Sequence, residues 1–188
     1  LFLLIDRVKV IYYSETRMAN RKIRFAINGF GRIGRVVARS WWEHYQSDLE
    51  LVAVNTSGSM DVSGWAHLLK YDSVHGRFPA KIRTQDPQKG KEIGRLNIAG
   101  KEISVLAERK PANIPWQNYD LDVVLECTGA FRSRKAEEHF KGGGVKRVII
   151  SAPAEDVPIY LLGVNADRYQ GEPLIEMGSC TTNCVGPI

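Results

Sequence analysis

Short apolar runs alternate with amphipathic segments along most of the chain. Residues 22–27 are mostly apolar, residues 28–45 carry apolar side chains at helical spacing, and residues 49–55 form a second run rich in β-branched residues. Runs of the first and third kind are typical of buried strands, and the spacing of the second is typical of a helix. The sequence therefore predicts a strand, a helix and a second strand, which together form a βαβ unit.

The alternation continues downstream. Asp61 is the expected N-cap of a helix over 61–71. The other expected elements are antiparallel strands within 72–106, strands over 120–129, 145–153, 157–165 and 173–179, and a helix over 133–144. This order predicts an α/β fold, a Rossmann-type doubly wound and mostly parallel sheet with a small antiparallel insertion. In such a sheet, ligands bind at the carboxyl ends of the strands.

Three glycines between the first strand and the first helix have the G-x-G-x-x-G spacing of a dinucleotide-binding turn. In this motif Gly29 allows the tight turn, Gly31 lets a pyrophosphate approach the backbone, and Gly34 brings the helix close to the strand. The amides at the helix start would bind the phosphates. The turn therefore predicts a nicotinamide dinucleotide cofactor.

The residue that holds the adenosine ribose in such folds is normally an acid at the end of the second strand. Here Thr56 stands at that place, after Asn55. A carboxylate would repel a ribose 2′-phosphate, whereas the hydroxyls of Thr56 and Ser57 would donate to it. We therefore expect NADP to be accepted, alone or alongside NAD. The alternative is that Asn55 or Asp61 serves NAD.

Composition and charge narrow the class of protein. The 188 residues include 44% apolar and 25% charged residues, and the net charge is +5, which is typical of a globular protein. The three cysteines, an odd number, favour a reducing cytoplasm over a disulfide framework. The apolar run at Leu1–Ile5 is far too short to span a membrane, and we expect no membrane partner.

The two ends of the chain are abrupt. Residues 1–17 precede Met18, the natural start, and are expected to be a non-native or disordered leader. Residues 18–178 are then the NAD(P)-binding domain, and 179–188 the beginning of a catalytic domain that is cut short.

Two cysteines lie in the segment "SCTTNC" at 179–184. The preceding strand is expected to end at Ser179 and a helix to begin at Cys180, where the helix N-terminus stabilises a thiolate. A thiolate there can add to an aldehyde and so prepare it for hydride transfer. Cys184 is expected to pack inward and Cys127 to be a core residue. A C-x3-C pair supplies only two of the four ligands of zinc, so no metal is expected.

Five motifs in this order, "INGFGRIGR", "HLLKYDSVHGRF", "KRVIISAP", "GVN" and "SCTTNC", resemble phosphorylating glyceraldehyde-3-phosphate dehydrogenase over residues 22–188. The resemblance implies a cytosolic glycolytic or gluconeogenic homotetramer. It would oxidise glyceraldehyde 3-phosphate with NAD(P) and inorganic phosphate to 1,3-bisphosphoglycerate.

The resemblance also implies roles for single residues. Cys180 matches the nucleophile, and Ser179 and Thr181 match the pair that binds the phosphate of the substrate or the attacking phosphate. The positions that match cofactor contacts are Arg32, Ile33, Arg109, Thr128, Gly129, Phe131 and Ser151. Departures from the usual pattern at Thr56, Cys127 and the "MGS" before Cys180 bear on cofactor preference.

The reaction also needs a general base, for which histidine is suited. His44 is expected to face solvent and His139 to lie on a surface helix, while His67 and His75 flank "LLKYDSVHG". The family's base lies further downstream than Ile188, so none of these four is assigned. The chain alone is expected to bind nucleotide without turnover.

Two other functions fit the same pattern. Erythrose-4-phosphate dehydrogenase is a close relative in which water instead of phosphate takes the acyl group. A non-catalytic nucleotide- or RNA-binding module would use the basic charge and the same groove. The second alternative leaves Cys180 unexplained, so no nucleic-acid partner is expected.

Overall fold

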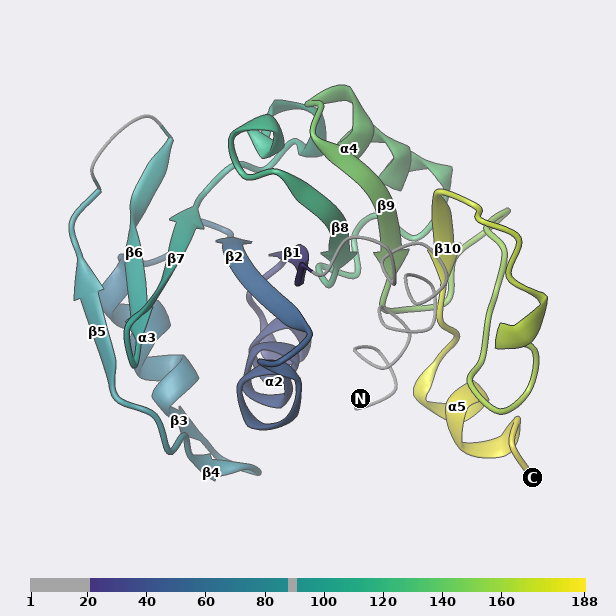
Figure 1. The fold of residues 1–188 in the computed structure, drawn as a ribbon, viewed down its shortest axis with the longest axis horizontal. Coiled ribbons are helices and arrows are strands. Elements are labelled where there is room, and N and C mark those ends of the chain that lie inside the picture. Colours follow the sequence, from purple (N-terminus) through teal and green to yellow (C-terminus); the bar gives the residue numbers. More distant parts are fainter. Residues whose placement is uncertain (1–20, 88–90) are drawn as a thin grey trace.

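The computed structural model of the chain describes residues 21–87 and 91–188, so the expected leader at 1–17 lies outside the described residues. Figure 1 shows a twisted sheet with α2 and α3 on one face and α4 on the other. The eight strands run in the order β10-β9-β8-β1-β2-β7-β6-β5. This arrangement confirms the predicted doubly wound α/β fold.

Six strands of the sheet are parallel, and two antiparallel strands extend one edge. The parallel strands are β1 (Ile23–Asn28), β2 (Leu49–Asn55), β7 (Lys101–Leu106), β8 (Leu121–Glu126), β9 (Val145–Ile150) and β10 (Leu174–Glu176). The edge strands are β6 (Glu92–Ile98) and β5 (Ile82–Gln85). The strand order reverses between β1 and β8, which is the switch point where doubly wound sheets bind their ligands.

The helices are short. They are α2 (Arg32–Ser40), continued by a π-helical turn at Trp41–Tyr45, then α3 (Val62–Lys70), α4 (Glu138–Lys141) and α5 (Cys180–Val185). Asp61 caps α3 as predicted, since its Oδ1 accepts the amide of Gly64 at 2.8 Å. Single 3-10 turns occupy Pro111–Asn113, Trp116–Asn118, Arg134–Glu137 and Ala166–Arg168, and β3 (Tyr71–Asp72) pairs with β4 (Gly76–Arg77). Among the described residues, each helix is too short or too polar to cross a bilayer.

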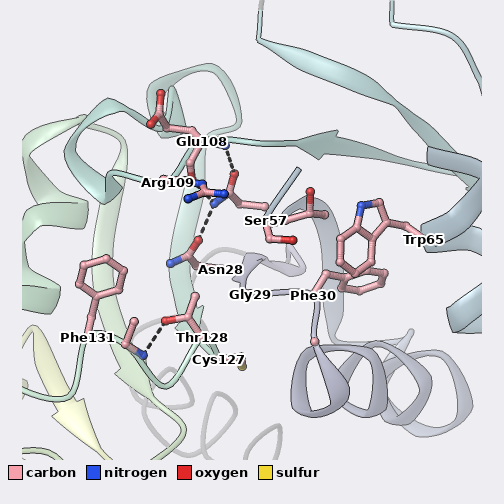
Figure 2. Close-up of a pocket in the computed structure, with 14 residues that line it drawn as sticks. Asn28, Gly29, Phe30, Ser57, Trp65, Glu108, Arg109, Cys127, Thr128 and Phe131 are labelled. Atoms are coloured by element: carbon pink, nitrogen blue, oxygen red, sulfur yellow. Dashed lines mark hydrogen bonds between the residues drawn. The ribbon is translucent and has the colours of Figure 1, made fainter. Parts of the chain in front are cut away.

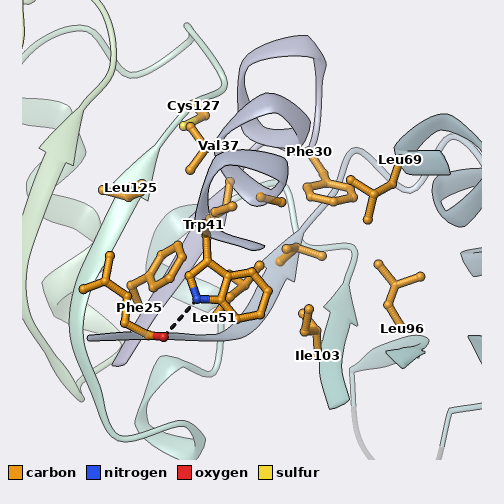
Figure 3. Close-up of a cluster of buried hydrophobic side chains, with 14 of the residues drawn as sticks. Phe25, Phe30, Val37, Trp41, Leu51, Leu69, Leu96, Ile103, Leu125 and Cys127 are labelled. Atoms are coloured by element: carbon orange, nitrogen blue, oxygen red, sulfur yellow. Dashed lines mark hydrogen bonds between the residues drawn. The ribbon is translucent and has the colours of Figure 1, made fainter. Parts of the chain in front are cut away.

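Two apolar cores lie on the two faces of the sheet because successive strand residues point to opposite sides. Phe25 packs on the α2 side against Trp41, with ring centroids 6.3 Å apart, and its neighbour Ala26 packs on the other side in the core of Trp116. Figure 3 shows the first core, in which the indole nitrogen of Trp41 donates to the carbonyl of Leu49 at 2.9 Å. These cores hold the strand ends, and hence the candidate site, in fixed positions.

Three expected elements differ from the structure. The strand expected over 157–165 does not form: Ile159 makes a single bridge to Glu176, and the side chain of Asn165 turns the chain by bonding the Leu161 amide and the Ile159 carbonyl. The helix expected over 133–144 is a 3-10 turn followed by the one turn of α4. The last strand expected in the antiparallel insertion, β7, pairs antiparallel with β6 as expected, but it also pairs in parallel with β2 and so joins the insertion to the parallel strands.

Candidate functional site: a cleft at the carboxyl ends of the strands

A cavity of about 350 Å³ opens at the carboxyl ends of β1, β2 and β8 and is closed on one side by the loop after β7 (Figure 2). Eight of its fourteen lining residues were named from the sequence as ligand contacts: Gly29, Gly31, Asn55, Thr56, Ser57, Arg109, Thr128 and Phe131. The other six were not named as contacts: Asn28, Phe30, Trp65, Glu108, Cys127 and Ala130. The remaining predicted site residues lie outside this lining: Arg32, Ile33, Gly34, Gly129, Ser151, Ser179, Cys180 and Thr181.

The glycine turn has the geometry that its spacing predicts. Gly29 has φ +95°, and a Cβ there would lie 2.6 Å from the amide nitrogen of Thr128. A Cβ on Gly34 would overlap the carbonyl oxygen of Gly29, so only glycine lets the helix approach the turn this closely. At Gly31, in contrast, a Cβ would meet nothing within 4 Å. Gly31 therefore leaves open space at the cavity wall, where a ligand can approach the backbone.

The start of α2 faces this space without a side-chain cap. Its N-cap residue is Gly31, no acid stands in its first turn, and Arg32 and Ile33 are exposed. The amides of a first helical turn have no partner within the helix and carry a partial positive charge. The turn is therefore suited to bind an anion such as a pyrophosphate, and the residues present fit a dinucleotide.

Two buried asparagines join the ends of the strands. Asn55 donates through Nδ2 to Oδ1 of Asn28 at 2.7 Å and to the carbonyl of Glu108 at 2.7 Å, and its Oδ1 accepts the Glu108 amide at 2.9 Å. Because its amide group is committed to these bonds, Asn55 holds the loop after β7 against β1. Asn55 therefore has a structural role in the cleft: it connects β1 to the loop after β7.

A buried carboxylate organises the other wall. Oε2 of Glu126 accepts Nδ2 of Asn28 at 2.5 Å and lies 2.9 Å from Nε2 of His139, while Oε1 accepts the amide of Thr128 at 2.8 Å and its hydroxyl. The indole N–H of Trp116 donates to Nδ1 of His139 at 3.0 Å. An indole can only donate, so Nδ1 is the acceptor and Nε2 carries the proton toward Glu126.

His139 is therefore not the surface residue that the sequence suggested. Its side chain is fully buried, although it stands on the single turn of α4. Its partners Trp116 and Glu126 are 23 and 13 positions away in the sequence, so no local pattern indicates this burial. His44, by contrast, is exposed at 47% of its side-chain area and faces solvent as expected.

Thr56 does not offer its hydroxyl to the cavity. The side chain is buried, its Oγ1 donates to the carbonyl of Leu106 at 2.9 Å, and the same oxygen accepts the amide of Gly58. The expectation that this hydroxyl would donate to a ribose phosphate is therefore wrong. Ser57, the next residue, is exposed and lines the cavity.

One acid does line the cavity, but it comes from a different strand end. Glu108 follows β7, and its carboxylate accepts the Lys110 amide at 3.0 Å and lies 3.1 Å from Nζ of Lys91. The hydrogen bond from the Lys110 amide, with that from Lys91, lowers the pKa of Glu108. This acid was not expected from the sequence, because the acid of such folds normally stands at the end of the second strand.

The three cysteines occupy different environments. Cys127 is buried at the cavity floor as predicted, and burial raises the pKa of its thiol to about 12, against a hydrogen bond with Ser151 that lowers it. Cys180 and Cys184 are exposed, so the expectation that Cys184 packs inward is wrong for this chain. Cys184 lies within the last turns of α5, where the described residues provide no covering element.

The segment around Cys180 is held by local hydrogen bonds. Ser179 caps α5 by accepting the amide of Thr182 at 3.0 Å, and Oγ1 of Thr182 accepts the Ser179 amide in return at 3.2 Å. Asn183 donates to the carbonyls of Met177 and Ser179 at 2.7 and 2.8 Å. These bonds fix the first turn of α5 and leave Cys180 and Thr181 exposed. Within 21–87 and 91–188, histidines, cysteines and acids form no group of three that could hold a metal ion.

The strand order, the glycine turn and the uncapped helix start define a nicotinamide-dinucleotide-binding domain. Residues 23–134 match the family model described as "Glyceraldehyde 3-phosphate dehydrogenase, NAD binding domain". The chain therefore belongs to the glyceraldehyde-3-phosphate dehydrogenase family.

Individual relatives agree with this assignment. Over 167 residues, which are 88% of this chain, it is 44% identical to a glyceraldehyde-3-phosphate dehydrogenase of Yarrowia lipolytica, covering 46% of that protein. Over the same length it is 42% identical to a cytosolic glyceraldehyde-3-phosphate dehydrogenase of Trypanosoma brucei brucei and 41% identical to glyceraldehyde-3-phosphate dehydrogenase A of Escherichia coli K12, covering 47% of each. The chain thus spans about half the length of these relatives.

Proposed function

We propose that this chain supplies the cofactor site and the nucleophile of an NAD(P)-dependent phosphorylating dehydrogenase. The enzyme oxidises glyceraldehyde 3-phosphate with inorganic phosphate to 1,3-bisphosphoglycerate. The observation that carries the proposal is the family's NAD-binding domain followed by Cys180, exposed in the first turn of α5. We further propose that the enzyme is a homotetramer of glycolysis or gluconeogenesis. We also propose that it is cytoplasmic, which is supported by the one relative named as cytosolic.

In the proposed reaction, the Cys180 thiolate adds to the aldehyde carbon and forms a hemithioacetal. Its hydroxyl loses a proton to a base, and the carbon gives up a hydride, for which the nicotinamide is the acceptor when bound. A thioester on Cys180 results. An oxygen of inorganic phosphate then attacks the thioester carbon, the C–S bond breaks, and the thiolate is restored as the acyl phosphate leaves.

The roles of Ser179 and Thr181 in this scheme are to bind phosphate beside Cys180. Ser179 is held by its capping bonds and Thr181 is exposed next to it. We further propose that the cofactor is NADP or either dinucleotide. The support for this proposal is that the β2 tip bears Thr56 in place of an acid, so that no carboxylate there opposes a 2′-phosphate.

None of the four histidines of this chain is assigned as the general base. His139 is buried between Glu126 and Trp116, and His44 is on the solvent-facing end of the turn after α2. We therefore propose that the 188-residue chain binds NAD(P) but does not turn over, and that the base comes from the half of the relatives that this chain does not match.

A chimera tests the reaction. The chain, from Lys22 onward, is joined to the remaining half of the Escherichia coli K12 relative. We expect NAD(P)H formation from glyceraldehyde 3-phosphate that requires inorganic phosphate and is lost in C180S but kept in C184S. Turnover by C180S would contradict the role of Cys180, and turnover without phosphate but with erythrose 4-phosphate would favour the alternative dehydrogenase.

A further inference from the structure

Trp65 holds a buried hydrogen-bond donor that has no partner. The residue is 5% exposed, and its Nε1 makes no hydrogen bond with any residue in the described ranges 21–87 and 91–188. The other tryptophan nitrogens of comparable burial are satisfied, since Trp41 donates to Leu49 and Trp116 to His139. A buried donor without a partner is costly and calls for an explanation.

The position of this donor suggests an explanation for its lack of a partner. Trp65 lies in the first turns of α3, directly after the β2 tip, and it lines the cavity. Its ring contacts Phe30 edge to face, with centroids 6.2 Å apart, and Figure 2 shows the indole nitrogen on the edge away from Phe30. In doubly wound folds the tip of the second strand is where the adenosine ribose lies. The unpaired donor is therefore at the ribose end of the cavity.

The groups around that end are mainly donors. An indole N–H can only donate, so its ligand must present an acceptor. Ser57 also lines the cavity, although its hydroxyl donates to that of Ser59 at 2.9 Å, and Arg109 brings a guanidinium to the cavity from the loop after β7. Thr56 is committed to backbone bonds, and the one lining carboxylate, that of Glu108, is paired with Lys91. The indole N–H of Trp65 and the charged guanidinium of Arg109 together favour an anionic acceptor over a neutral hydroxyl.

We propose that Nε1 of Trp65 donates to the 2′-phosphate of a bound NADP, which makes Trp65 a specificity-determining residue for the cofactor. The proposal rests on the proposed function, because it requires the cavity to hold a nicotinamide dinucleotide. Since the nitrogen is buried, the indole or the exposed segment 57–59 shifts when the ligand enters.

The test compares W65F with W41F in the 188-residue chain. Both changes remove one indole N–H and keep an aromatic ring, but only Trp41 loses an existing hydrogen bond. Calorimetric titration with 2′,5′-ADP, NADP, 5′-AMP and NAD is combined with thermal unfolding. For W65F we expect affinity for 2′,5′-ADP and NADP to fall about tenfold and affinity for 5′-AMP and NAD to stay within twofold. Because both variants lose buried ring volume but only W41F also loses a hydrogen bond, the melting temperature of W65F should fall less than that of W41F. For W41F we expect a lower melting temperature and unchanged affinities.

Other outcomes overturn the proposal in distinguishable ways. If W65F binds 2′,5′-ADP as tightly as the wild type, Trp65 does not contact the nucleotide. If it loses affinity equally for 5′-AMP, the contact is to another part of adenosine. If the wild type binds none of the four ligands, the proposed function itself fails.

A second measurement covers the case in which W65F does not fold. In the wild-type chain with ¹⁵N-labelled tryptophan, the four indole signals are assigned by elimination with W41F, W42F and W116F. Addition of 2′,5′-ADP should move the Trp65 indole proton downfield, and 5′-AMP should not. An unmoved Trp65 signal at saturating 2′,5′-ADP would contradict the contact.

Discussion

Nε2 of His139 lies 2.9 Å from Oε2 of Glu126, and both side chains are buried. The two residues are 13 positions apart in the sequence and come from α4 and β8. Through Glu126 this pair also holds Asn28 and Thr128, two residues of the cavity wall. The apolar layer above the sheet is thus connected to the candidate cofactor site by a chain of hydrogen bonds.

The first prediction concerns this carboxylate. In E126Q, an amide NH2 group replaces one of the two carboxylate oxygens. This group can only donate, yet it faces another donor, either that of Thr128 or those of Asn28 and His139. We expect a loss of about 1–3 kcal/mol in unfolding free energy, since a buried donor is left unsatisfied, and weaker nucleotide binding because Thr128 is released. Urea unfolding and calorimetry measure the two effects. E155Q, the same change at an exposed residue, should alter neither the unfolding free energy nor nucleotide affinity. If E126Q were as stable as the wild type, the hydrogen bonds of Glu126 would not contribute to stability as proposed.

The second prediction separates the two glycines that follow Phe30. In G34A the new methyl group overlaps the carbonyl of Gly29, and we expect a loss of about 3 kcal/mol in stability. In G31A the methyl group enters open space, so stability should fall by less than about 1 kcal/mol, the cost of alanine at an N-cap. NAD affinity of G31A should nevertheless fall at least about tenfold, because that space is where a pyrophosphate meets the backbone. Unchanged NAD binding by G31A would show that the ligand lies elsewhere.

The third prediction is a pH dependence near the amino end of β8, at the end of the strand opposite the cavity. Burial raises the pKa of Asp122, but hydrogen bonds from Arg21, Lys146 and the amide of Arg24 outweigh it, so the pKa is lowered from its ordinary value of 3.8. A carboxyl group whose pKa is lower in the folded state stabilises the fold above its unfolded pKa, and this stability is lost as the pH falls through the folded value.

We therefore expect the unfolding free energy of the wild type to decline below about pH 4 and D122N to lack part of this decline. At pH 7, D122N should be less stable by about 2 kcal/mol, since its bonds to charged groups weaken. Chemical unfolding between about pH 2.5 and about pH 7, a range that includes the ordinary pKa of a carboxyl group, measures both. D167N, at an exposed position, serves as the control. A D122N curve parallel to that of the wild type would rule out Asp122 as the titrating group.

The fourth prediction concerns thiol reactivity. Because Cys127 is buried with a raised pKa of about 12, iodoacetamide should not modify it in the folded chain and should do so only in urea. Cys180 and Cys184 are exposed and should react without denaturant. Peptide mass spectrometry after a timed reaction distinguishes the three sites. Modification of Cys127 as fast as Cys184 in the folded chain would mean that the cavity floor opens.

Elements whose cause is local were predicted well from the sequence. β2 has the predicted bounds, Asp61 caps α3, and α5 begins at Cys180 as expected, although the strand before it ends at Glu176 and not at Ser179. The expected strand over 157–165 failed because apolar composition does not reveal that the side chain of Asn165 bonds the backbone and turns the chain there. Composition also could not show that Trp65 would be buried without a hydrogen-bond partner.

The sequence by itself determined the βαβ order, the glycine turn and the cysteine at a helix start, because each depends on residues within a few positions of one another. Only the tertiary structure decided the burial of His139, the commitment of the Thr56 hydroxyl to Leu106 and the junction of Asn28 with Glu126. These bonds join segments 50 and 98 residues apart, and such partners are chosen by the packing of the sheet and not by any local pattern.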